Sequence, residues 1–100
     1  MSGLHMVILE QMLSCPTTMK ILLALLDEKQ AYQSQLARLT GGVPPTILTA
    51  LAILMDAKLI TTTRPERPKK NTKDFYELTA RGHHVANHLK ELARSLENGK

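Results

Sequence analysis

Two glycines and two prolines within five positions constrain this chain more than any other feature of its sequence: Gly41, Gly42, Pro44 and Pro45. Glycine adopts positive φ angles without a steric penalty, which suits a tight turn. Proline suits the first turn of a helix, where no amide donor is needed. Apolar residues recur at helical spacing on both sides of this segment. The sequence therefore predicts two helices joined by a short, sharp turn.

The two helices beside this turn differ in length. The first starts at Gln33 or Ser34 and covers residues 35–39, and two of its leucines are predicted to turn inwards, Leu36 and Leu39. The second is predicted over residues 44–58, and three of its apolar residues share one face, Ile47, Leu51 and Leu54. That face is expected to pack on the core.

Two more helices are predicted before this pair. Residues 1–5 show no periodicity and are left out of the fold prediction, whereas residues 6–14 are rich in apolar side chains. This first helix stops at Cys15, because the residue before Pro16 disfavours helical geometry. Thr17 or Thr18 is then expected to cap the second helix, which carries an apolar stripe at helical spacing, Ile21, Leu22, Leu25 and Leu26.

The helical period is lost after the fourth helix. Residues 59–63 are rich in β-branched side chains and predict a strand, and residues 73–78 predict a second one. The intervening residues 64–72 contain two prolines and predict a loop, so the two strands form a hairpin. Thr79 is expected to cap a final helix over residues 80–97.

The whole net charge of the chain lies in this hairpin. The chain carries a net charge of +4, and residues 64–73 hold five basic residues and one acidic residue. The remainder holds eight basic and eight acidic residues. Such a local basic segment suits a polyanion as partner. It equally suits a solvated loop that only aids solubility, so charge alone leaves both interpretations open.

Taken in order, these elements resemble the winged helix-turn-helix regulators of the MarR, PadR and ArsR types. The resemblance covers about residues 17–95. It rests on four segments, Lys20–Leu26, Gln35–Leu39, Leu48–Leu54 followed by Leu59 and Ile60, and Phe75–Gly82, the last with a Tyr-x-Leu-Thr-x-x-Gly pattern. The resemblance implies a mainly α fold with a small β-hairpin. It divides the chain into an N-terminal segment with the first helix (1–16), a winged helix-turn-helix core (17–79) and a dimerisation helix (80–100).

The resemblance also implies duplex DNA as the partner. The recognition helix, residues 44–58, would enter the major groove and turn five side chains towards base edges, Pro45, Thr46, Thr49, Ala50 and Ile53. The basic wing, residues 64–73, would contact phosphates or the minor groove through Arg64, Arg67, Lys69, Lys70 and Lys73. Ser34 and Gln35, near a helix start, are candidate phosphate contacts.

One departure from that pattern keeps a second function open. The predicted recognition helix has no Arg or Lys before Lys58, so the commonest specific contact, a basic side chain to guanine, is missing there. Threonine hydroxyls and apolar contacts to thymine methyl groups remain. The alternative interpretation is a winged-helix module that binds another protein.

The final helix predicts a homodimer. Four apolar residues recur at alternating spacings of four and three, Val85, Leu89, Leu92 and Leu96, which gives a narrow stripe suited to a partner helix. Packing against the chain's own first helix is the other interpretation, and both hold together in one dimer. The related regulators commonly dimerise through terminal helices.

The sequence predicts neither a cofactor nor a metal site. His84 and His88 have the spacing of metal ligands on one helix face, with Glu91 one turn on, but no cysteine lies nearby to complete a set. A solvated histidine pair is the favoured interpretation.

An enzyme is not expected, because the sequence has no Gly-rich phosphate loop, nucleophile elbow or HExxH pattern. The chain has one cysteine, Cys15, and we expect a cytoplasmic protein without a membrane span.

Overall fold

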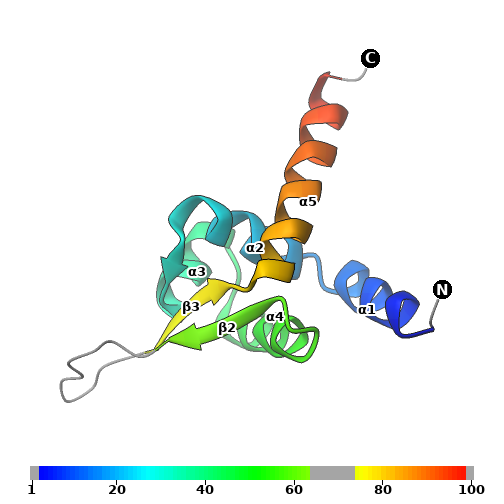
Figure 1. The fold of residues 1–100 in the computed structure, drawn as a ribbon. Helices are drawn as coiled ribbons and strands as arrows, with labels where there is room; N and C mark the ends of the chain where they lie inside the picture. The colour runs from blue at the N-terminus through cyan, green and yellow to red at the C-terminus, as the bar shows by residue number, and fades with distance from the viewer. Residues whose placement is uncertain (1–2, 64–73, 99–100) are drawn as a thin grey trace.

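The computed structural model describes residues 3–63 and 74–98, which form five helices and a three-stranded sheet (Figure 1). In chain order the elements are α1 (Gly3–Ser14), α2 (Thr17–Glu28), β1 (Gln30–Ala31), α3 (Gln33–Thr40), α4 (Pro44–Asp56), β2 (Ile60–Thr63), β3 (Phe75–Leu78) and α5 (Ala80–Asn98). The predicted mainly α fold with a small hairpin is confirmed. The basic wing residues lie outside the described residues.

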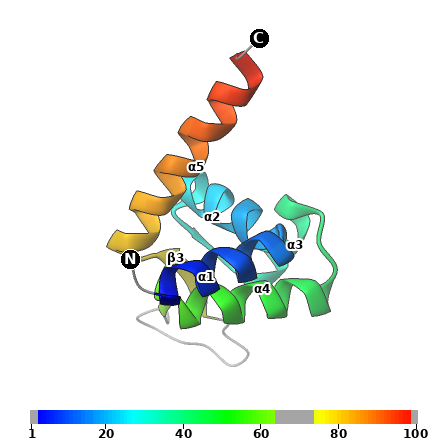
Figure 2. The same ribbon diagram turned by 90° about the vertical axis from the view of Figure 1, so that its right-hand side faces the viewer.

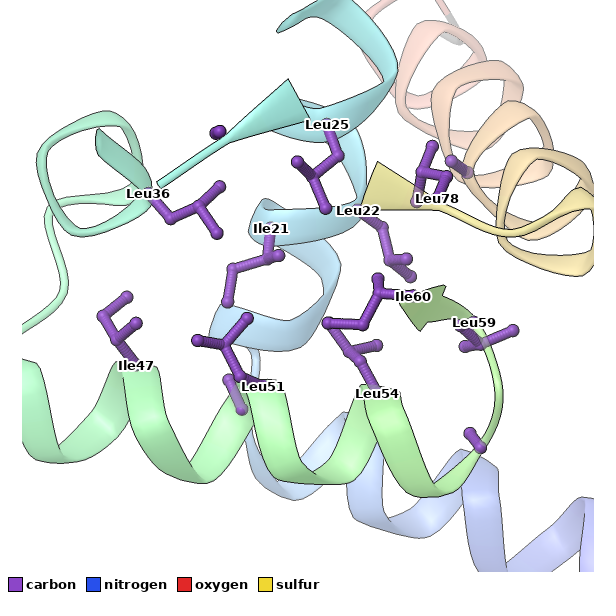
Figure 3. Close-up of a cluster of buried hydrophobic side chains, with 14 of the residues drawn as sticks. Ile21, Leu22, Leu25, Leu36, Ile47, Leu51, Leu54, Leu59, Ile60 and Leu78 are labelled. Carbon is purple, nitrogen blue, oxygen red and sulfur yellow. The ribbon is translucent and has the colours of Figure 1, made fainter. Parts of the chain in front are cut away.

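Helix α2 forms the centre of the core. Its buried residues Ile21, Leu22 and Leu25 face the predicted inner face of α4, which is formed by Ile47, Leu51 and Leu54 (Figure 3). Each of these six side chains is at most 3% exposed. Leu36, Ile60 and Leu78 close the core from α3 and the sheet. The apolar stripes predicted for the two long core helices are therefore confirmed.

The turn between α3 and α4 has the predicted chemistry. Gly41 ends α3 in the left-handed conformation, with φ 73°, and its amide donates to the carbonyl of Ala37. Pro44 and Pro45 occupy the first positions of α4, and the two helices meet at a bend of 108°. One prediction here is wrong: Leu39 is 50% exposed, because an eight-residue helix turns only Leu36 fully into the core.

The sheet contains one strand more than predicted. Strand β3 lies in the middle and pairs antiparallel with both β1 and β2. Gln30 lies opposite Glu77, and Thr63 lies opposite Phe75. The predicted hairpin is confirmed at its two strands, whereas β1 is only two residues long and shows no alternation that a sequence pattern could reveal.

The Tyr-x-Leu-Thr-x-x-Gly pattern builds the corner where β3 becomes α5. The amide of Thr79 donates to the Leu59 carbonyl. Its hydroxyl donates to the Lys58 carbonyl at 2.7 Å and accepts from the Gly82 amide at 3.0 Å, so the predicted cap is confirmed. A Cβ atom at Gly82 would collide with the Leu59 carbonyl. The pattern therefore fixes the base of α5 against the chain just after α4.

The caps predicted for α2 are wrong. Pro16 precedes the helix, which begins already at Thr17. The Thr18 hydroxyl is buried and donates backwards to the Cys15 carbonyl at 2.8 Å. The hydroxyl therefore pairs with the carbonyl of the residue that follows α1 and caps no amide of α2.

The two terminal helices lie at the edge of the core. In Figures 1 and 2, α1 lies along the α4 side of the molecule and the C-terminal part of α5 projects beyond the other elements. Apolar side chains on both helices stay exposed, among them Leu13 at 68% and Leu96 at 74%. These helices contribute surface as much as core.

Candidate nucleic-acid interface

Helix α4 has one face in the core and one open face. Ala50, predicted to face base edges, has no exposed surface, and Ile53 is partly buried and packs against the core cluster. The prediction for Ala50 is therefore wrong, and Ile53 points largely inwards. Pro45 and Thr49 are exposed as expected, and Thr46 is partly exposed.

Sequence reasoning missed three residues of the open face. Leu48 is 54% exposed and Met55 39% exposed, and Ala52 is exposed between them. We call Pro45, Leu48, Thr49, Ala52 and Met55 the outer face of α4. The signal was present in the sequence, because these positions lie opposite the inward stripe on a helix with 3.6 residues per turn.

The chemistry of the outer face is apolar with one hydroxyl. The Thr49 hydroxyl donates to the Pro45 carbonyl at 3.0 Å, so its oxygen presents lone pairs to an incoming group. Asp56, at the exposed end, is the only charged residue in the sequence of α4. This face offers apolar contact and one hydrogen-bond acceptor, but no cation.

Beside the start of α4, an open groove of about 550 Å³ runs between α3 and the start of β3. It is lined by Gln33, Ser34, Ala37, Pro44, Asp74 and Tyr76. Ser34 is exposed, as a phosphate contact would require. The Gln35 side-chain oxygen instead accepts from the Tyr32 amide at 2.8 Å, which leaves only its NH₂ group to donate outwards.

A second apolar surface lies between α1 and α5. It encloses a groove of about 620 Å³ whose lining includes Ile8, Leu9, Met12, Leu13, Met19, Val85, Leu89 and Leu92. Of the four predicted dimer residues, Val85 and Leu89 pack partly on the chain's own core, whereas Leu92 and Leu96 are 57% and 74% exposed. The stripe thus serves internal packing at one end and leaves its other end uncovered.

The histidine pair forms a contact within α5. The Nε2 atoms of His84 and His88 lie 3.2 Å apart, with the rings edge to face. Within residues 3–63 and 74–98, three or more His, Cys, Asp or Glu side chains do not gather in a group that would hold a metal ion.

Glu77 ties the three strands together. It accepts hydrogen bonds from the Gln30 amide group at 3.1 Å and from the Thr63 hydroxyl at 2.8 Å. These two bonds, that of Gln30 first, hold the pKa of Glu77 below its ordinary value of 4.5.

In the described part of the chain, no single helix has both the length and the apolar character to cross a membrane. Two pairs of neighbouring helices, α1 with α2 and α3 with α4, have that length and apolar character only when the two helices are taken together. Each pair is sharply bent where its first helix ends.

The fold is similar to those of known transcriptional regulators. No protein-family model matches the sequence, and comparison with curated proteins also gives no match. Among solved structures, the transcriptional regulator homologue from Pyrococcus horikoshii superposes with a TM-score of 0.71 at 19% identity, over 99% of this chain and 97% of that one. A MarR-family regulator from Silicibacter pomeroyi gives 0.69 at 21% identity, over 81% of this chain and 55% of that one.

The PcaV transcriptional regulator from Streptomyces coelicolor gives a TM-score of 0.68 at 23% identity, over 78% of this chain and 57% of that one. The chain thus spans little more than half the length of the MarR-family regulator and of PcaV. Likeness at these identities concerns the fold. The helix-turn-helix of α3 and α4, the three-stranded sheet and the terminal helices give this chain the winged helix-turn-helix fold of MarR-type regulators.

Proposed function

We propose that this chain is a transcriptional regulator that binds duplex DNA as a homodimer. The observation that carries the proposal is the exposed outer face of α4, the second helix of the sharply bent helix-turn-helix, which stays uncovered by the rest of the described chain. An α-helix presented in this way fits the major groove. The structural neighbours are transcriptional regulators, which supports the same function.

In this mechanism the two helices of the helix-turn-helix contact different parts of the DNA. The outer face of α4 approaches base edges, whereas Ser34 at the start of α3 donates to a phosphate. The basic segment 64–73 supplies the electrostatic attraction, because it carries the net charge of the chain. No catalytic or cofactor role is assigned to any residue, and the place of action is the cytoplasm.

The dimer is proposed to form through the groove between α1 and α5. Exposed apolar patches on small proteins commonly mark interfaces, and this groove continues into the uncovered Leu92 and Leu96. Two-fold symmetry would bring a second copy of the same surface against it. The two α4 helices would then read half-sites about 34 Å apart, one turn of duplex, so the target is a pseudo-palindrome.

Fluorescence anisotropy on a duplex of random sequence, repeated over a salt series, tests the proposal. The wild-type protein is expected to bind with a steep salt dependence. The variant Lys69→Gln/Lys70→Gln should bind all sequences more weakly, with a salt slope smaller by about two. Lys90→Gln, an exposed change on α5, is the matched control and should keep the slope. An unchanged slope in the double variant would remove the basic segment from the mechanism.

A protein-interaction module is the second candidate, and the absence of Arg and Lys from the sequence of α4 favours it. The same titration distinguishes the two functions. A folded protein that binds no duplex even at low salt would leave the outer face of α4 as a docking surface for another protein.

A further inference from the structure

We propose that α4 selects T·A base pairs, with Leu48 reading the thymine methyl group and Thr49 accepting from adenine. This inference rests on the proposed DNA binding and names the kind of sequence that is bound. It follows from the chemistry of the outer face as the structure presents it, since the sequence alone placed Ala50 and Ile53 there.

Leu48 is the largest apolar group on the part of α4 that would enter a groove. It is 54% exposed, one turn beyond the start of the helix and beside the exposed Ala52. Pro45, at the tip, has no amide hydrogen to donate. The leading half of the face therefore presents carbon atoms almost throughout.

Thr49 adds a hydrogen-bond acceptor to this face. Its hydroxyl proton is committed to the Pro45 carbonyl at 3.0 Å, so the oxygen faces outwards as an acceptor. A group that donates a hydrogen bond, such as the adenine amino group, can pair with it. The cytosine amino group also donates there, so Thr49 requires an amino group without choosing between the two pairs, and the choice rests on Leu48.

This pattern matches the T·A pair through its methyl group. Thymine is the base with a methyl group in the major groove, where it can contact Leu48. Both pairs present two acceptors and one amino donor in the major groove, so the methyl group is the feature that separates T·A from G·C on this face. Discrimination thus arises from apolar contact with the methyl group.

The leading half of α4 carries no charged side chain of its own. The acidic Asp56 lies at the far end of the helix, so the N-terminal half can approach phosphates with less repulsion. Ser34 and the groove along α3 lie beside the same half, and the acidic Asp74 also lines this groove.

The test compares two alternating duplexes that differ only in the methyl group, one of adenine and thymine and one of adenine and uracil. The wild-type protein should bind the uracil duplex more weakly, by about fourfold for each methyl group contacted. Leu48→Ala should bind both duplexes equally. Leu39→Ala, which removes an equally exposed leucine from α3, should keep the wild-type preference. Because Leu48 is exposed, thermal melting of Leu48→Ala should match that of the wild type.

The outcomes separate the inference from the proposed function. Equal binding of both duplexes by the wild type, or an undiminished preference in Leu48→Ala, would overturn the reading of methyl groups while DNA binding stands. Failure of the wild type to bind either duplex at low salt would overturn both. Loss of the methyl preference in Leu48→Ala but not in Leu39→Ala supports the inference.

Discussion

The molecule exposes two apolar surfaces, and they differ in shape. The groove between α1 and α5 is concave and is framed by two helices that extend from the core. The outer face of α4 is a single convex ridge, one helix wide, with a threonine hydroxyl in its middle. A concave apolar surface can enclose side chains of a second copy, whereas a single ridge can enter a groove. In the proposed function, similar residue types would therefore serve different partners because the backbone arranges them differently.

The strongest test of this difference changes only the concave surface. Leu13→Glu/Leu92→Glu places charges on two side chains that line the groove and are 68% and 57% exposed. The variant should fold but sediment as a monomer at micromolar concentration, since buried charges oppose association. Its affinity for a palindromic duplex should fall about a hundredfold, because the two half-sites then bind independently.

Leu39→Glu is the matched control, because this leucine is 50% exposed on α3 and does not line the groove. It should remain dimeric. A wild-type monomer with no change in sedimentation on adding duplex would contradict the dimer and leave the groove as internal packing.

A smaller effect of opposite sign is expected on the convex surface. Asp56→Asn removes the one charge in the sequence of α4, and with it repulsion from phosphates. Affinity for any duplex should rise about threefold at low salt, and the gain should shrink as salt is added. Glu97→Gln, exposed near the end of α5, should leave affinity unchanged. An equal gain in both variants would show a general charge effect and no proximity of α4 to DNA.

The smallest effect is expected in the sheet, at Glu77. The lowered pKa of Glu77 means that its hydrogen bonds stabilise the fold above pH 4.5. That contribution is lost as the pH falls through the lowered folded value. The melting temperature of Glu77→Gln should therefore fall less than that of the wild type between pH 6 and pH 3. The difference should be small because the carboxylate is partly exposed. Identical pH profiles would contradict the assignment.

Most of the fold could be predicted because it depends on local patterns. The Gly41 turn, the two prolines of α4 and the Thr79 cap each follow from backbone chemistry that a few residues determine. Strand β1 could not be predicted, because its two residues are held only by pairing with β3. The predicted caps of α2 were wrong because the Thr18 hydroxyl donates to the Cys15 carbonyl, just after α1, instead.

The candidate site was predicted less well than the fold. Helix α4 could be located from the turn before it, but the rotation of the helix decides which side chains point outwards. Ala50 and Leu48 are two positions apart, yet one is fully buried and the other 54% exposed. Taking the inward stripe of Ile47, Leu51 and Leu54 as the reference would have given the correct outer face.

The close approach of Gly82 to the Leu59 carbonyl has a mechanical consequence. It holds the first turn of α5 in close contact with the residues that immediately follow α4. Helix α5 has 19 residues and so is about 28 Å long. A small rotation about that contact therefore displaces the far end of the helix much more than its first turn. In the proposed dimer, a tilt of a few degrees where the two α5 helices meet would swing each α4 along the duplex axis. In that dimer, the fit to a half-site spacing would depend on the angle between α5 and the core, far from the bases.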